Sequence, residues 1–108
     1  MLLLSPNQRI FIAVKTIDFR CGIDAIVAIC KKQLAQDPTT GHLFLFRNRR
    51  GNSIKIIAYD YNGFALYHKR LSYGTFKSWP SSPQAVLTLS TEQLRLLVYN
   101  GNPPPVPA

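Results

Sequence analysis

The positions of apolar residues predict a strand and then a helix in the first third of the chain. Residues 9–14, Arg-Ile-Phe-Ile-Ala-Val, form a short run rich in β-branched and aromatic side chains, which is typical of a buried strand. From Gly22 onward apolar residues recur at a helical spacing, and Asp37-Pro38 ends this pattern because a proline pushes the preceding residue out of the helical region. We therefore expect a helix over residues 22–36. Its apolar stripe consists of Ile23, Ile26, Val27, Cys30 and Leu34.

The middle third contains three apolar runs separated by turn residues, which predicts an antiparallel meander. The runs at residues 42–47, 54–59 and 64–71 are strand-like. Arg50-Gly51-Asn52-Ser53 is typical of a tight turn with Gly51-Asn52 as a two-residue loop. Asp60-Tyr61-Asn62-Gly63 is a second turn signal. We expect these three strands to pair in sequence order, with the N-terminal strand added to them.

Residues 89–99 contain the start and stop signals of a second helix. Ser90 stands at the N-cap position, Gln93 completes a capping box, and Asn100-Gly101 supplies the stop. The four prolines of residues 102–108 predict a flexible tail. The fold class is therefore α+β, an antiparallel β-meander with one helix packed on a face and a second, C-terminal helix. We expect a single domain over residues 1–101, followed by the tail.

Strand alternation also predicts what each face of the meander buries. The stripe of the first helix must pack on an apolar face, and Leu43, Leu45, Ile54 and Ile56 are suitable partners. The opposite face is then partly exposed, and it is too apolar to stay bare unless the C-terminal helix or another protein covers it. The residues of this second face are Phe44, Phe46, Ile57, Tyr59 and Leu66.

Length and composition narrow the class of protein. The 108 residues form one domain, too small for a dinucleotide-binding fold with a substrate domain or for a TIM barrel. No stretch approaches the roughly 18 apolar residues of a membrane span, so we expect a cytoplasmic protein with no membrane partner. Cys21 and Cys30 are too few for a secreted disulfide framework and lack the close spacing of a zinc site, so both are expected to be reduced.

Basic residues outnumber acidic ones by 13 to 5, which gives a formal net charge of +8. Such an excess suggests a polyanionic partner, because each phosphate that Lys or Arg neutralises releases counterions. If the hairpins pair as their turns suggest, the cations of the meander gather near one end of the strands; a rim that only aids solubility is the alternative. The candidate phosphate contacts are Arg47, Arg49, Arg50, Lys55, Lys69 and Arg70. Tyr59, Tyr67 and Trp79 are candidates for stacking on a base, with burial in the core as the alternative.

The acidic residues and histidines provide little support for an enzyme. Asp18, Asp60 and Glu92 occur in the order of a DDE nuclease triad, which binds two Mg²⁺ ions. Each also has a structural interpretation. Asp18 is placed as a helix cap, Asp60 as the first residue of a turn, and Glu92 in the first turn of a helix, where the helix dipole favours a carboxylate. His42 and His68 are isolated in sequence from suitable partners, and no glycine-rich phosphate loop occurs. We expect no catalytic residues, no metal site and no cofactor.

A set of ordered motifs runs through residues 18–80. They are Asp18-Phe19-Arg20 with Gly22 and Asp24, then Asp37-Pro38, Gly41-His42-Leu43-Phe44-Leu45-Phe46-Arg47-Asn48-Arg49-Arg50-Gly51, Ile54-Lys55, Asp60, Gly63, Lys69-Arg70-Leu71 and Trp79-Pro80. In these motifs and their spacing the chain resembles the TnpB-type accessory proteins of the insertion-sequence-sixty-six (IS66) class of transposons. That family is distinct from the RNA-guided nuclease that shares the TnpB name.

The resemblance implies a non-catalytic protein that assists a separate, large DDE transposase. It also implies that Arg20 joins the candidate DNA contacts. The chain departs from the family pattern at Cys21, where a basic residue is usual, and at Asn52, where an acidic one is common. It departs again at Ala58-Tyr59, where paired tryptophans are frequent, and this departure weakens a stacking role centred on that site.

Two functions are consistent with these features. The first is an accessory protein of transposition that binds DNA, for example the ends of the element, through a basic sheet edge. The alternative is a protein-interaction subunit that docks on the transposase, or self-associates as a homo-oligomer, through an exposed apolar sheet face. Arginines that were scattered over unrelated sides, or neutralised by internal ion pairs, would contradict the first function.

Overall fold

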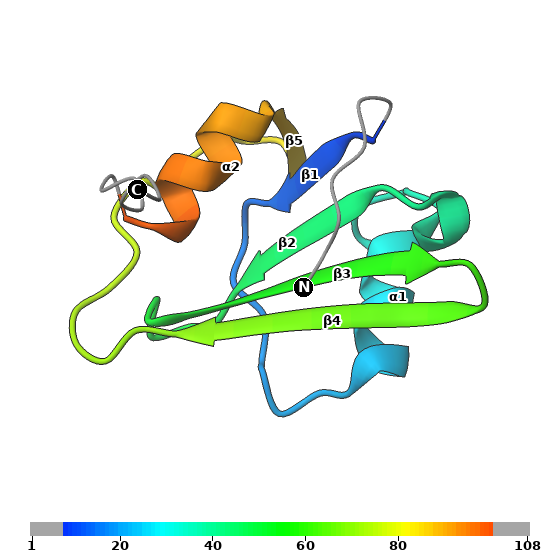
Figure 1. Cartoon of the computed structure of the whole chain (residues 1–108), viewed down its shortest axis with the longest axis horizontal. Coiled ribbons are helices and arrows are strands. Elements are labelled where there is room, and N and C mark those ends of the chain that lie inside the picture. The colour runs from blue at the N-terminus through cyan, green and yellow to red at the C-terminus, as the bar shows by residue number, and fades with distance from the viewer. Residues whose placement is uncertain (1–7, 101–108) are drawn as a thin grey trace, which may run out of the picture.

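The computed structural model describes residues 8–100, which form one five-stranded sheet with a helix on each face (Figure 1). The strand order is β4-β3-β2-β1-β5, and the predicted α+β class is confirmed. The proline-rich tail predicted for residues 102–108 lies outside the described residues, so the domain boundary stays a prediction. The elements are β1 (Ile10–Ala13), α1 (Ile23–Lys32), a 3-10 turn η1 (Pro38–Thr40), β2 (Leu43–Arg47), β3 (Ser53–Asp60), β4 (Gly63–Arg70), β5 (Val86–Leu89) and α2 (Thr91–Val98).

The predicted meander is present as β2, β3 and β4, which pair antiparallel in sequence order. Phe44 lies opposite Ile57, and the pairing ends where the Asn48 N–H donates to the Ser53 carbonyl at 3.2 Å. The loop therefore covers residues 49–52 and not Gly51-Asn52 alone. Since the register differs by two residues, every side chain of β2 and β3 stays on its predicted face.

The sheet is wider than the predicted one, because β1 pairs on both sides. It runs parallel to β2, with α1 in the crossover between them, and antiparallel to β5. The strand β5 was not predicted. Its sequence Val-Leu-Thr-Leu is four residues long and directly precedes the helix start, so it offers too little alternation to be recognised.

Both helices form where the sequence predicts them, with one difference in length. Helix α1 ends at Lys32 and not at residue 36, because Ala35 adopts a left-handed φ of 53° and the Gln36 N–H donates back to the Cys30 carbonyl at 2.9 Å. The capping box of α2 is confirmed: Ser90 Oγ accepts from the Gln93 N–H at 3.1 Å, and Gln93 Oε1 accepts from the Ser90 N–H at 2.8 Å. Within residues 8–100, neither helix has the length and apolar character needed to cross a membrane.

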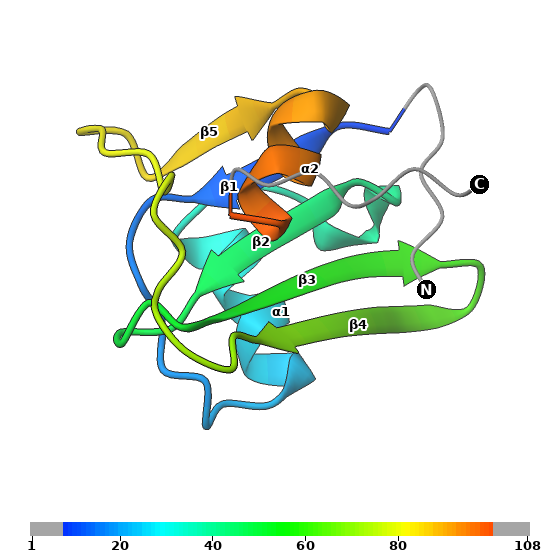
Figure 2. The same ribbon diagram turned by 60° about the vertical axis from the view of Figure 1, so that its left-hand side comes forward.

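The predicted assignment of helices to sheet faces is wrong (Figure 2). Helix α1 packs through Ile26 and Cys30 on the face of Phe44, Phe46 and Ile57. Helix α2 covers the other face and packs through residues 94, 97 and 98 against the side chains at positions 43, 45, 54 and 56. Strand alternation separates the two faces but does not say to which face a helix returns, since that depends on the path of the crossover between β1 and β2. As a result, the expected bare face is filled by α1 at its centre.

Candidate nucleic-acid interface

Strands β1, β2 and β4 run in the same direction, so their carboxyl ends lie at one edge of the sheet (Figure 1). Arg47 and Arg70 are the last residues of β2 and β4. Arg49 and Arg50 follow β2 directly, and Arg20 lies in the loop that leaves β1. Three chain segments thus bring cations to one place. We call this group of side chains the basic edge, and it consists of Arg20, Arg47, Arg49, Arg50 and Arg70.

Backbone hydrogen bonds hold these three segments together. The Ile17 N–H, in the loop after β1, donates to the Arg47 carbonyl at 3.0 Å. On the other side, the Leu71 and Phe76 N–H groups donate to the carbonyls of Asn52 and Gly51, both at 2.8 Å. The turn that presents Arg49 and Arg50 is therefore fixed to both of its neighbours, and the spacing of the cations is set by main-chain contacts.

The turn itself is stabilised by its own polar side chains. Asn48 donates through Nδ2 to Asn52 Oδ1 at 2.7 Å, and its Oδ1 accepts from the Ser53 N–H at 3.0 Å. Gly51 has a φ of 74°, in the left-handed region that glycine tolerates best. With the backbone satisfied in this way, the side chains of Arg49 and Arg50 are free to extend into solvent, and both residues are exposed.

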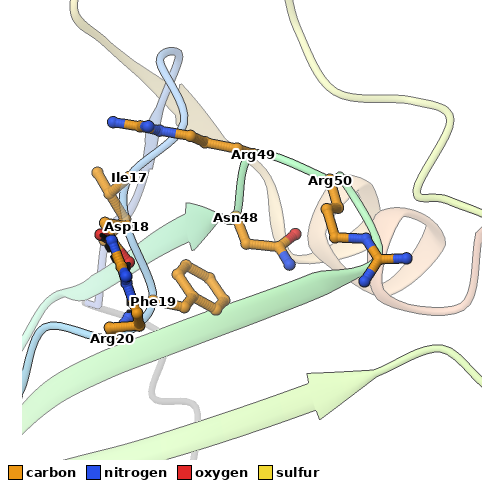
Figure 3. A pocket seen from close by; sticks show the side chains of 7 residues that line it. All are labelled: Ile17, Asp18, Phe19, Arg20, Asn48, Arg49 and Arg50. Atoms are coloured by element: carbon orange, nitrogen blue, oxygen red, sulfur yellow. Dashed lines mark hydrogen bonds and ion pairs between the residues drawn. The ribbon is translucent and has the colours of Figure 1, made fainter.

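A shallow groove of about 350 Å³ lies between the loop after β1 and this turn (Figure 3). Arg20 and Asp18 face each other in it, with Arg20 Nη2 at 2.7 Å from Asp18 Oδ2. The hydrogen bonds from Arg20 lower the pKa of the Asp18 carboxyl to about 2, so Asp18 is an anion at neutral pH. In Figure 3 Arg49 extends above Ile17, whereas Arg50 points away on the other side of the turn. Asp18 thus forms its ion pair with Arg20, and the charge of Arg49 acts on it more weakly through space.

Of the other four carboxylates, Asp24 lies in the first turn of α1, and the remaining three are far from the basic edge. Asp60 ends β3, Asp37 precedes η1 and β2, and Glu92 follows β5, all at the opposite edge of the sheet. Asp18, Asp60 and Glu92 therefore do not converge as a nuclease triad would require. Among residues 8–100 there is no group of three or more His, Cys, Asp or Glu side chains that could hold a metal ion.

Two candidate phosphate contacts point into the molecule instead of toward the edge. Lys55 is only 7% exposed, and its Nζ donates to the Phe19 carbonyl at 3.0 Å and lies 4.8 Å from the centre of the Phe19 ring. Lys69 Nζ donates to the Val98 carbonyl at 3.0 Å, at the end of α2, and lies 4.4 Å from the Tyr99 ring. Both lysines join elements of this chain to the sheet, so we leave them out of the candidate interface.

The three predicted stacking residues are half-buried and have partners within the chain. Tyr59 lies near the far end of β3 and packs edge-on against Phe64, with ring centres 5.1 Å apart. Tyr67 packs against the cluster beneath α2. Trp79 does reach the basic edge, but its ring is covered by Arg47, whose Cζ lies 5.0 Å from the ring centre. Of these three aromatic residues, only Trp79 belongs to the candidate interface.

The structure adds two residues that sequence reasoning missed. Tyr73 follows β4 in the loop beside the basic edge and is 90% exposed. Lys15 follows β1 at the same edge and is also exposed. The sequence signal for Tyr73 was its position next to Gly74 in a predicted turn, whereas Lys15 had no comparable signal. A fully exposed tyrosine beside unpaired arginines is suited to stack on a nucleic-acid base.

Neither histidine has a catalytic environment. His42 Nδ1 accepts from the Arg9 N–H at 2.9 Å, and the ring packs edge-on against Phe11. His68 packs edge-on against Phe19. Partial burial, together with the charges of Lys55 and Arg70, lowers the pKa of His68.

Comparison with known proteins gives one family. Residues 8–103 match the family described as "IS66 Orf2 like protein". Two proteins of Sinorhizobium fredii (strain NBRC 101917 / NGR234) are similar to the chain. "Uncharacterized protein y4hO" is 37% identical over 91% of this chain and 84% of its own length, and "Uncharacterized protein y4jC" is 36% identical over 87% and 80%. No solved structure matches. The resemblance expected from the motifs is thus confirmed, and the chain belongs to the IS66 Orf2-like family, whose role in transposition is an accessory one.

Proposed function

We propose that the chain assists transposition by binding DNA, and that the basic edge makes the contact. The observation that supports this most directly is the set of exposed arginines Arg49, Arg50 and Arg70. Their side chains make no hydrogen bond and no ion pair within residues 8–100, although the turn after β2 and the end of β4 bring them to the same edge of the sheet. Exposed like charges repel one another, and a neighbouring polyanion relieves that repulsion.

The separation of charges supports the same function. Asp18 is the one carboxylate that lines the groove, and Asp37, Asp60 and Glu92 lie at the opposite edge of the sheet. One guanidinium group can donate two parallel hydrogen bonds to two oxygens of a phosphate. Several arginines along an edge therefore suit a run of backbone phosphates. The contacts proposed here go to phosphate, and Tyr73 adds a base contact where a base is unstacked.

A salt titration with two double variants tests the proposal. Arg49→Gln/Arg50→Gln removes two charges from the basic edge, and Lys31→Gln/Lys32→Gln removes two exposed charges from the end of α1. Binding of a fluorescein-labelled DNA duplex is measured by anisotropy over a range of salt concentrations. If each arginine neutralises one phosphate, the slope of log K against log salt falls by about 1.8 in the arginine variant. The lysine variant keeps the wild-type slope. Absence of binding at low salt, or equal slopes for the two variants, would refute the proposal.

A second pair of variants tests the aromatic contact. Tyr73 and Tyr61 are 90% and 94% exposed, and they lie at opposite edges of the sheet. Tyr73→Ala is expected to weaken binding of single-stranded DNA by about 1–3 kcal/mol for one lost stacking contact. Tyr61→Ala is expected to bind as the wild type does. Equal effects of the two substitutions would remove Tyr73 from the interface.

The alternative, docking on the transposase or self-association, has less support. The face it requires is occupied at its centre by α1, where Phe44, Phe46 and Ile57 are at most 1% exposed. What remains is Leu66, 41% exposed on the outer strand β4, which hydrogen-bonds to β3 on one side only. Sedimentation of the wild type and of Leu66→Ser tests self-association: a concentration-dependent dimer that the substitution abolishes would favour it.

A further inference from the structure

Arg47 differs from the other cations of the basic edge. It is half-buried, and its Nε is enclosed with no hydrogen-bond partner, the one buried side-chain nitrogen or oxygen of residues 8–100 in that state. Buried donors in proteins are almost always bonded, so an enclosed guanidinium nitrogen without a partner requires an explanation. A contribution to stability does not explain it, because the missing bond destabilises the fold.

The side chain of Arg47 lies close to Trp79 and to the turn. Its Cζ lies 5.0 Å above the Trp79 ring, and Trp79 is itself fixed, because its Nε1 donates to the Ala13 carbonyl at 3.0 Å. The turn lies nearby as well, since a Cβ added to Gly51 would stand 3.9 Å from Arg47 Cδ. With its Nε enclosed and its Cζ over the Trp79 ring, the guanidinium has little rotational freedom to lose when it binds a ligand.

We infer that Arg47 is a preorganised phosphate receptor, which takes one phosphate of the DNA backbone end-on through Nη1 and Nη2, with Trp79 as its platform. This inference rests on the proposed DNA binding and assigns a particular contact within it. Nε is enclosed, which excludes a side-on approach that would use Nε and one Nη. The two Nη atoms are not among the enclosed atoms and make no hydrogen bond in the described part of the chain, so they reach solvent.

The surroundings favour an anion at this point. Burial lowers the pKa of Arg47, which means that its charge is less well solvated than that of an exposed arginine. Neither of the two ion pairs within residues 8–100 involves Arg47. A phosphate supplies both the counter-charge and two acceptor oxygens. These two oxygens match the planar pair of donors of a guanidinium better than they match the donors of an ammonium group. Trp79 accordingly stacks on a guanidinium and not on a base.

The first test compares Arg47→Met with Arg50→Met. Methionine keeps an aliphatic chain over Trp79 and removes the unpartnered nitrogen, so Arg47→Met is expected to melt at or above the wild-type temperature. It is also expected to weaken duplex binding at least tenfold and to lower the salt slope by about 0.9. Arg50→Met is expected to lower the slope similarly with a smaller loss of affinity, because an exposed side chain is less preorganised. A lower melting temperature for Arg47→Met, with affinity no weaker than that of Arg50→Met, would make Arg47 a packing residue and overturn the inference.

A second measurement separates this inference from the proposed function. The enclosed Arg47 Nε–H is expected to give a slowly exchanging signal in a ¹H–¹⁵N spectrum, which Arg47→Met identifies by its disappearance. On addition of inorganic phosphate this signal is expected to shift saturably, and at lower concentration than the signals of the exposed arginines. If duplex DNA does not bind but the shift occurs, the receptor stands and the proposed DNA binding fails. If DNA binds through Arg49 and Arg50 while the Arg47 signal never shifts, the proposed function stands and the receptor fails.

A conservative substitution tests the geometry. Arg47→Lys keeps the charge but loses the planar pair of donors and the stacking on Trp79. It is expected to restore most of the salt slope and little of the affinity that Arg47→Met loses. Full recovery of affinity by lysine would show that only charge matters at this position and would overturn the end-on receptor.

Discussion

Lys55 is a cation that stabilises the fold in place of the DNA contact expected from the sequence. By its position in the basic meander it was a candidate phosphate contact, yet it is 7% exposed and donates to the Phe19 carbonyl at 3.0 Å. This bond ties the loop after β1 to the sheet. Lys55→Met keeps an unbranched apolar chain as far as Cε and removes the ammonium group, so it is expected to destabilise the fold and to leave DNA binding almost unchanged.

The magnitude follows from the contacts that are lost. A hydrogen bond involving a charged group contributes about 1.5–3 kcal/mol, and the ammonium 4.8 Å from the Phe19 ring adds about 0.5–2 kcal/mol. Against this, methionine is easier to bury than an ammonium ion, which offsets part of the loss. We expect a net loss of about 1–2 kcal/mol in the free energy of unfolding. For a domain of this size that lowers the melting temperature by about 5–10 °C.

The assay is thermal unfolding followed by circular dichroism, with anisotropy titrations of the same samples against a DNA duplex. Lys31→Met is the matched control, since it makes the same chemical change at an exposed position and is expected to change stability by less than about 0.5 kcal/mol. A Lys55→Met protein that melts with the wild type but binds DNA as weakly as Arg49→Gln/Arg50→Gln would refute the reasoning, because Lys55 would then contact phosphate.

Three further predictions concern the N-cap of α2, the Asp18 carboxyl and the Cys30 thiol. Ser90→Ala removes the acceptor for the Gln93 N–H at 3.1 Å and is expected to lower the free energy of unfolding by about 0.5–2 kcal/mol, measured by urea denaturation. The Asp18 carboxyl is expected to titrate with a pKa of about 2 by ¹³C NMR, and to return toward 3.8 in Arg20→Gln. Because the folded-state pKa is the lower one, any stability from this pair is complete above the unfolded pKa and is lost as the pH falls toward 2. Burial raises the pKa of the Cys30 thiol to about 11, so iodoacetamide at about pH 8 should alkylate Cys30 only on unfolding, whereas reaction of the native protein at Cys30 would contradict its burial.

Local sequence determined the elements of this protein except β5. Period-two runs between turn residues predict β2, β3 and β4, and Ser90 with Gln93 predicts the start of α2, because these signals involve residues close together in the chain. The face of each strand residue also follows from local alternation, and the longer loop at residues 49–52 left the faces unchanged because it shifted the register by two residues. Even the gathering of Arg47, Arg49 and Arg50 is local, since they follow one strand.

Tertiary structure decided what each side chain packs against. Which helix covers Leu45 or Phe46, and that β5 joins β1, depend on segments far apart in the chain, which no local pattern contains. The same is true of the cations. Lys55 becomes a structural residue because the Phe19 carbonyl happens to lie above it, and Arg47 becomes a constrained guanidinium because Trp79 lies beside it. The sequence determines which charged residues are present and on which face of a strand each one lies. Only packing determines which of them remain exposed and unpaired, because the residues that bury or pair with them are distant in sequence.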